Sequence, residues 1–164
     1  MASTVSIIIP TLNEAVLLPA LLDALRAQTH TPEEIIVADA GSSDDTVEIA
    51  RRTGCRVVLG GRPAVGRNAG AEVARGDVLL FLDADVLPPP YFLACTLSEF
   101  EKRRLVVATC RSWPYDGKSV DSYLHEIANW YIRMLRPFSP HAPGFCLFSR
   151  RWAHKAAEGF DETL

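Results

Sequence analysis

Short apolar runs recur along the first half of the chain, and their length predicts strands. Four runs of four or five mostly apolar residues read as strands of a buried sheet: Val5–Ile9, Ile35–Ala38, Arg56–Leu59 and Val78–Leu82. We expect Pro10 to stop the first of them, because proline cannot donate to a sheet hydrogen bond. Polar segments long enough for a helix separate the four runs.

Each of these separating segments carries a helix signal. Leucines recur at helical spacing over Leu17–Leu25, and Val65–Arg75 reads as a further helix. Between them, Ser43 is placed to cap a helix that opens with the acidic pair Asp44–Asp45 and ends at Gly54. Strands that alternate with helices are typical of an α/β fold in which helices cover both faces of a mostly parallel sheet.

The alternation weakens after three prolines at 88–90. We expect the following elements beyond them: a helix over Tyr91–Arg103, a strand over Leu105–Thr109, a loop over Arg111–Ser119, a helix over Val120–Leu135, a strand over Gly144–Phe148 and a helix over Arg151–Ala157. Residues 1–87 therefore read as a binding module, and residues 88–164 as the part that completes its site.

Composition narrows the class of protein. The length of 164 residues suits one domain, and 48% hydrophobic with 23% charged residues is ordinary globular composition. A net charge of -3 argues against nucleic acid as a partner. Four cysteines form no metal-binding or disulfide pattern, which favours a reducing compartment. Because we find neither a signal peptide nor a membrane span, we expect a cytoplasmic protein.

Two carboxylates follow the fourth apolar run directly, at Asp83 and Asp85. Residues two apart on a strand point the same way, so both should project from the carboxyl edge of the sheet, where ligands bind in open α/β folds. Two adjacent carboxylates repel each other unless a cation lies between them, and Mg²⁺ or Mn²⁺ bound to a diphosphate fits. Taken alone, the pair could equally cap a turn or a helix.

Five sequence motifs in order resemble family 2 glycosyltransferases. They are Ser6-Ile7-Ile8-Ile9-Pro10-Thr11-Leu12-Asn13-Glu14, Ile35-Ile36-Val37-Ala38-Asp39-Ala40-Gly41-Ser42-Ser43-Asp44-Asp45-Thr46, Gly66-Arg67-Asn68-Ala69-Gly70, Phe81-Leu82-Asp83-Ala84-Asp85 and Gly159-Phe160-Asp161-Glu162. The resemblance implies a nucleotide-diphosphate-sugar donor and a single α/β domain of the GT-A type. Residues 1–87 would then be the nucleotide-binding half, and residues 88–164 part of the acceptor half.

The resemblance also implies roles for individual residues. Nucleotide-binding residues would be Pro10, Leu12, Glu14, Asp39, Arg67 and Asp83, and the metal ligands would be Asp83 and Asp85. Two positions depart from the family pattern: Ala40 stands where many members have a second acid, and Leu12 where an aromatic residue is common. The base of the nucleotide therefore stays undetermined.

The family's general base usually follows the turn at Gly159–Glu162, and we expect it beyond Leu164, in a chain truncated at its C-terminus. The resemblance implies inverting transfer to an acceptor that in many relatives is lipid-linked. Trp130, Tyr131, Met134, Leu135 and Phe138 could make a helix that contacts the inner face of the membrane, although core packing is the commoner role for such a helix.

Two other functions are also compatible with the sequence. A phosphohydrolase can use an Asp-x-Asp pair, but usually on its first strand and not on its fourth. A non-catalytic module would bind the nucleotide-sugar without turnover. Asp44 and Asp45 are better explained as helix-capping charges than as metal ligands.

Overall fold

The computed structural model describes residues 3–111, 127, 130, 134 and 144–163. Its strands and helices are, in chain order, β1 (Val5–Thr11), α1 (Leu18–Arg26), β2 (Glu34–Asp39), α2 (Thr46–Arg52), β3 (Arg56–Leu59), α3 (Pro63–Val73), β4 (Val78–Leu82), α4 (Phe92–Lys102), β5 (Val107–Thr109), β6 (Cys146–Arg150) and α6 (Arg151–Ala156). The predicted alternation of strands and helices is therefore confirmed through β4, α4 and β5.

The strands form one six-stranded sheet in the order β3-β2-β1-β4-β6-β5. Strands β1 to β4 run parallel, whereas β6 runs antiparallel to both of its neighbours, β4 and β5. The order reverses between β1 and β4, because the chain first builds outward to β3 and then returns to the other side of β1. Such a switch point leaves a crevice at the carboxyl ends of the strands.

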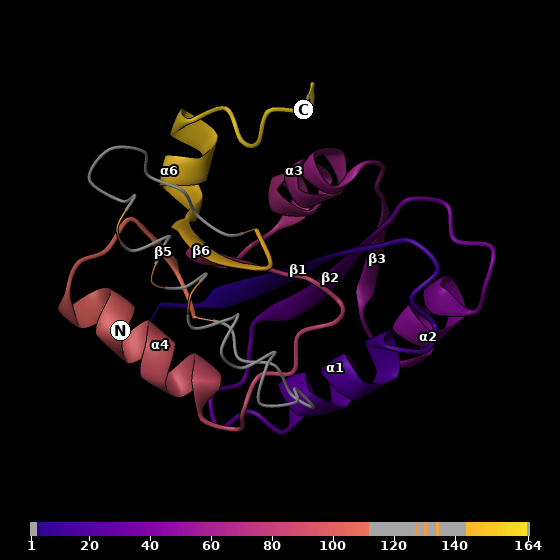
Figure 1. The fold of residues 1–164 in the computed structure, drawn as a ribbon, viewed down its shortest axis with the longest axis horizontal. Coiled ribbons are helices and arrows are strands. Elements are labelled where there is room, and N and C mark those ends of the chain that lie inside the picture. Colours follow the sequence, from indigo (N-terminus) through magenta and orange to yellow (C-terminus); the bar gives the residue numbers. More distant parts are fainter. Residues whose placement is uncertain (1–2, 112–126, 128–129, 131–133, 135–143, 164) are drawn as a thin grey trace.

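Helices cover both faces of the sheet (Figure 1), with α1, α2 and α4 on one face and α3 and α6 on the other. Successive side chains of a strand point to opposite faces of the sheet, so the core is divided into two clusters, one on each face. Ile7 and Ile9 of β1 pack in the larger cluster with the leucines of α1, while Ile8 packs in the smaller cluster with Ala71 of α3. Each fully buried aliphatic side chain contributes about 1.5–3 kcal/mol of burial free energy.

Strand β1 passes through Pro10 and ends at Thr11, so the prediction that Pro10 stops it is wrong. The carbonyl of Thr11 accepts the N–H of Ala40, so the backbone polar groups of Thr11 point toward β2. Pro10 therefore turns its nitrogen toward β4, whose pairing with β1 has already ended at Ile8 and Phe81. No sheet hydrogen bond is lost, and β1 and β4 separate beyond this point.

Other bounds also differ from the prediction. Helix α2 begins at Thr46, and Ser43 does not cap it, since the Ser43 hydroxyl donates to Asn13. Asp44 accepts the Thr46 N–H at 3.0 Å instead. The C-terminal strand is β6, two residues later than expected. The predicted loop 111–119 and helix 120–135 lie almost wholly outside the described residues. Among the described helices, none is long and apolar enough to cross a membrane.

Candidate active site

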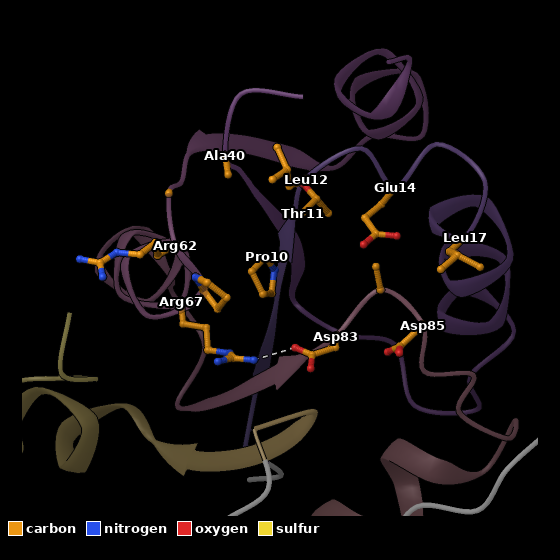
Figure 2. A pocket seen from close by; sticks show the side chains of 13 residues that line it. Pro10, Thr11, Leu12, Glu14, Leu17, Ala40, Arg62, Arg67, Asp83 and Asp85 are labelled. Atoms are coloured by element: carbon orange, nitrogen blue, oxygen red, sulfur yellow. Dashed lines mark hydrogen bonds and ion pairs between the residues drawn. The ribbon is translucent and has the colours of Figure 1, made fainter. Parts of the chain in front are cut away.

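A pocket of about 650 Å³ opens at the carboxyl ends of the parallel strands, where β1 and β4 separate (Figure 2). Its volume lies within the range of small-molecule sites. The lining residues all fall between positions 10 and 85: Pro10, Thr11, Leu12, Glu14, Leu17, Ala40, Gly61, Arg62, Pro63, Arg67, Asp83, Ala84 and Asp85. The loops after β1, β2, β3 and β4 and the start of α3 thus build one site.

The pocket brings together six of the seven residues that the sequence suggested as ligand contacts: Pro10, Leu12, Glu14, Arg67, Asp83 and Asp85. The seventh, Asp39, ends β2 and is buried, but it does not line the pocket. Its neighbour Ala40 does. The roles of these residues in ligand binding stay predictions, while their common location is an observation.

Three acids line the pocket: Glu14, Asp83 and Asp85. In Figure 2 the Glu14 carboxylate extends from the β1 side toward the segment that carries the two aspartates. Burial raises the pKa of Glu14 above its ordinary value, and the negative charges of Asp85, Asp44 and Asp83 raise it further. The neighbouring carboxylates thus add to the effect of burial on Glu14.

Arg67 of α3 provides positive charge against this acidic group. Its Nη2 atom lies 2.7 Å from Oδ1 of Asp83, and the same atom donates to the carbonyl of Gly144 at 3.2 Å. The Arg67 side chain is 14% exposed and that of Asp83 is 35% exposed, so the ion pair is largely shielded from water. Asp83 is further fixed through its backbone N–H, which donates to Phe145.

Asp39 organises the turn that follows β2. Its Oδ1 accepts hydrogen bonds from the hydroxyls of Thr11 and Ser42, and its Oδ2 accepts the backbone N–H groups of Gly41 and Ser42. Burial on its own would raise the pKa of Asp39, but these hydrogen bonds outweigh it and hold the pKa below its ordinary value. Gly41 adopts φ = 93°, a conformation that favours glycine.

The loops after β1 and β2 are fastened together, and this places Glu14. Asn13 adopts φ = 58°, its N–H donates to Ser42 Oγ, and its Oδ1 accepts the Ser43 N–H, each at 2.8 Å. The backbone N–H of Glu14 donates to Thr46 Oγ1, also at 2.8 Å. The backbone of Glu14 is therefore held, and its carboxylate is left to face the pocket.

Sequence reasoning missed Arg62, which lines the pocket at the N-terminal end of α3. Arg62 belongs to no recognisable motif. The one sequence feature that could have pointed to it is the following Pro63, because proline is common in a first helical turn and would place Arg62 at the start of a helix. Asn68 was also missed as a side chain with a role, although it stands in the Gly66–Gly70 motif. It binds the turn after α6.

The donor set fits a hard divalent cation. Asp83 and Asp85 offer carboxylate oxygens at the pocket wall, and Glu14 lines the same pocket, so a cation there would offset the charge of these acids. Among the described residues, no group of three or more His, Cys, Asp and Glu side chains is arranged to hold a metal ion. Two carboxylates supplemented by phosphate oxygens from a substrate are the usual arrangement for Mg²⁺.

Two relatives among curated proteins share substantial sequence with this chain. The validoxylamine A glucosyltransferase of Streptomyces hygroscopicus subsp. limoneus is 34% identical over 135 residues, which covers 74% of this chain and 29% of that protein. The undecaprenyl-phosphate 4-deoxy-4-formamido-L-arabinose transferase of Serratia proteamaculans is 32% identical over 146 residues, which covers 80% and 42%. The chain thus spans less than half the length of these relatives.

Solved structures confirm the GT-A-like fold class. S. aureus TarS 1-349 superposes with a TM-score of 0.73 at 22% identity, covering 98% of this chain and 51% of that one. Glucosyl-3-phosphoglycerate synthase of Mycobacterium tuberculosis, in complex with Mn²⁺, UDP and glucosyl-3-phosphoglycerate, gives 0.65 at 21% identity, covering 92% and 57%.

The sequence itself decides the family. The model of the family described as glycosyl transferase family 2 matches residues 6–156, nearly the whole chain. Four of the five motifs that suggested this resemblance lie within that segment, and three of them overlap strands β1, β2 and β4, whose carboxyl ends frame the pocket. The predicted resemblance is confirmed: the chain belongs to glycosyl transferase family 2.

Proposed function

We propose that this chain binds a nucleotide-diphosphate-sugar in the pocket between β1 and β4 and takes part in transferring the sugar to an acceptor. The observation that carries the proposal is the composition of the pocket wall. Three acids and two arginines, Glu14, Asp83, Asp85, Arg62 and Arg67, converge at the carboxyl edge of the sheet. Because all lining residues come from positions 10 to 85, we assign donor binding to the half at 1–87.

The nucleoside would lie against the loops after β1 and β2. Pro10, Leu12 and Ala40 supply an apolar wall there, and Glu14 stands at its end. UDP is the first nucleotide to test, because the Mycobacterium synthase of similar fold was solved with UDP. Asp39 supports this wall indirectly, because it holds the turn that follows Ala40. A direct contact between Asp39 and the base stays a prediction.

Asp83 and Asp85 would hold a Mg²⁺ or Mn²⁺ ion together with the diphosphate of the donor. When bound, the ion supplies Lewis-acid stabilisation of the negative charge that accumulates on the departing diphosphate. Mn²⁺ in the structure of the Mycobacterium synthase supports this choice. Arg67 leaves one oxygen of Asp83 free, because its ion pair uses Oδ1.

The reaction would break the bond between the sugar C1 and the phosphate oxygen and form a bond between C1 and an acceptor hydroxyl. The acceptor proton passes to a general base, and inversion at C1 requires that base opposite the leaving group. We assign no base within the described residues. Asp161 is a poor candidate, since its Oδ1 accepts the N–H of Thr163 at 2.9 Å and is used within its own turn.

A lipid-linked acceptor is our proposal for the second substrate. It is supported by the Serratia relative, whose name specifies an undecaprenyl-phosphate acceptor. Of the residues suggested for membrane contact, Trp130 and Met134 lie within the described part, and both are exposed, as is Ile127. We propose that this surface lets the protein work at the inner face of the membrane. Binding to anionic vesicles that is lost in Trp130→Ser would support this, and equal binding by both chains would contradict it.

Donor hydrolysis separates the proposed function from its two rivals. The chain is incubated with UDP- and GDP-sugars in Mn²⁺, and release of the nucleoside diphosphate is measured. We expect slow release from one of these donors, abolished by EDTA and by Asp85→Asn. Donor binding without any release, with or without acceptors, would favour a binding module. Release of phosphate from simple esters without nucleotide binding would favour a phosphohydrolase.

A further inference from the structure

The side chain of Asn68, in α3, makes three hydrogen bonds to the turn at Gly159–Glu162. Its Nδ2 donates to the carbonyl of Phe160 at 2.9 Å and to Oε1 of Glu162 at 2.8 Å. Its Oδ1 accepts the N–H of Phe160 at 2.8 Å. The amide thus pairs with the backbone of Phe160 on both sides, as a neighbouring strand would. We call Asn68 with residues 159–162 the clamp.

The geometry of the clamp leaves no space for a side chain at position 159. Gly159 has φ = 81°, and a Cβ atom there would stand 2.5 Å from Oδ1 of Asn68. This close approach explains why the turn begins with glycine. Behind it, the ring of Phe160 packs edge-on against Phe81 of β4, with the ring centroids 4.9 Å apart. The clamp therefore joins α3 to the strand that leads into Asp83.

The same turn contacts both arginines that line the donor pocket. The Arg67 guanidinium lies over the Phe160 ring, with Cζ 5.6 Å from the ring centroid. The Nη2 atom of Arg62 donates to the carbonyl of Glu162 at 3.0 Å. A segment about a hundred residues away in sequence thus supports the two cations on the pocket wall.

One atom of Arg67 is left without a partner. Its Nη2 binds Asp83 and Gly144, but its Nε is buried and makes no hydrogen bond within the described residues. A buried donor without an acceptor is costly unless a ligand supplies one. Phosphate oxygens are suitable acceptors for a guanidinium group, since it presents several N–H donors in one plane.

We propose that Asn68 is a positioning residue, which fixes the turn 159–162 so that Arg62 and Arg67 present their guanidinium groups to the diphosphate of the donor. The inference rests on the proposed function, because it assumes a diphosphate in this pocket. Asn68 itself lines the groove between α3 and α6 and does not line the donor pocket. It acts through the two arginines.

Two ligands that differ by one phosphate test this role in the full chain. Affinities for UDP and UMP are measured by calorimetry in Mn²⁺ for the wild type and for Asn68→Ala. We expect UDP binding to weaken about tenfold, the effect of one hydrogen bond to a charged group, while UMP binding changes little. A residue that only supports the fold would weaken the binding of both ligands to the same extent.

A double-mutant cycle shows whether Asn68 acts through Arg67. In the Arg67→Ala background, Asn68→Ala should cost less UDP affinity than it does in the wild type, and the remaining loss should come through Arg62. Phe160→Leu is the second variant, because it keeps the backbone contacts of the clamp and removes the ring beneath Arg67. Phe160→Leu should also weaken the binding of UDP more than that of UMP. If Asn68→Ala does not fold, this variant alone tests whether the clamp positions Arg67. Glu72→Ala, an exposed change on the same helix, is the matched control and should leave both affinities unchanged.

Three results would overturn the inference: equal losses for UDP and UMP, an undiminished loss in the Arg67→Ala background, or unchanged UDP affinity in both clamp variants. Failure of the wild-type chain to bind UDP or any other nucleoside diphosphate is a different result. It would contradict the proposed function itself, and with it the diphosphate on which the clamp is inferred to act.

Discussion

At the scale of single residues, the site is defined by charges that the fold holds close together. Glu14, Asp83 and Asp85 come from two loops, and their mutual repulsion is offset only in part by the ion pair between Arg67 and Asp83. Such an arrangement is costly in an isolated chain and becomes favourable when a cation binds. The Asp83 and Asp85 motif could be read from the sequence, whereas the proximity of Glu14 to it depends on the sheet order.

Removing one of these charges should change the titration of another. Asp85→Asn should lower the pKa of Glu14 toward its ordinary value, because Asp85 is the largest of the charges that raise it. Added Mg²⁺ should shift the wild-type pKa in the same direction if the ion binds between the loops. NMR titration of the Glu14 carboxyl carbon measures both effects. A Glu14 pKa that stays unchanged in Asp85→Asn and with Mg²⁺ would separate Glu14 from the proposed metal site.

Asp39 gives a second prediction at this scale. Its lowered pKa means that folding favours the carboxylate, so its contribution is present above the ordinary value of 3.8 and is lost as the pH falls through the lower folded value. Asp39→Asn should destabilise the chain by about 1–3 kcal/mol at neutral pH, with a smaller difference below pH 3.8. Urea unfolding at several pH values measures this. Asp45→Asn, exposed in the same loop, is the control. A difference independent of pH would show that the charge of Asp39 does not matter.

At the scale of elements, helix α3 determines how the pocket is placed relative to the sheet. Its two buried glycines face the strands: a Cβ atom at Gly66 would touch Pro10 and Ala38, and one at Gly70 would overlap the side chain of Ile8. The helix therefore lies close against β1 and β2, which brings Arg62 and Arg67 to the pocket wall. The sequence predicted a helix over Val65–Arg75, close to the observed Pro63–Val73, but the reason for its glycines appears only where the helix meets the strands.

Enlarging one of these glycines tests the close packing. Gly70→Ala should lower the free energy of unfolding by about 1–3 kcal/mol, although alanine is the better helix former, because the added methyl group overlaps Ile8. Chemical denaturation provides the measurement, with Glu72→Ala as the exposed control on the same helix. In an Ile8→Ala background the same change should cost less. A Gly70→Ala chain as stable as the wild type would mean that α3 can move away from the sheet.

The element scale also shows where sequence patterns fail. Arg56–Leu59 and Val78–Leu82 were predicted with the observed bounds, because each is a short apolar run between clear breaks. Pro10 was wrongly expected to end β1, since the missing N–H matters only on a side where a neighbour pairs. Ser43 was wrongly expected to cap α2, because both Ser43 and Asp44 offer oxygens and only the loop geometry decides between them.

At the scale of the whole molecule, the reversal of strand order between β1 and β4 explains where the site lies. The predicted α/β class and parallel sheet are confirmed, and so is the family, because five weak motifs occurred in the right order. The antiparallel β6 and the return of residues 159–162 to α3 could not be predicted, since no local pattern records pairing between distant segments.

The central claim is that the pocket binds a nucleoside diphosphate with a divalent cation held by Asp83 and Asp85. Calorimetric titration of the chain with UDP, in Mn²⁺ and again in EDTA, tests it most directly. We predict that Mn²⁺ strengthens binding by about tenfold or more, since the ion neutralises both the acids and the phosphates. Asp85→Asn should remove this gain, while binding in EDTA should be no weaker than that of the wild type, because one carboxylate that repels the phosphates is gone. Equal UDP affinity in Mn²⁺ and EDTA would contradict the claim.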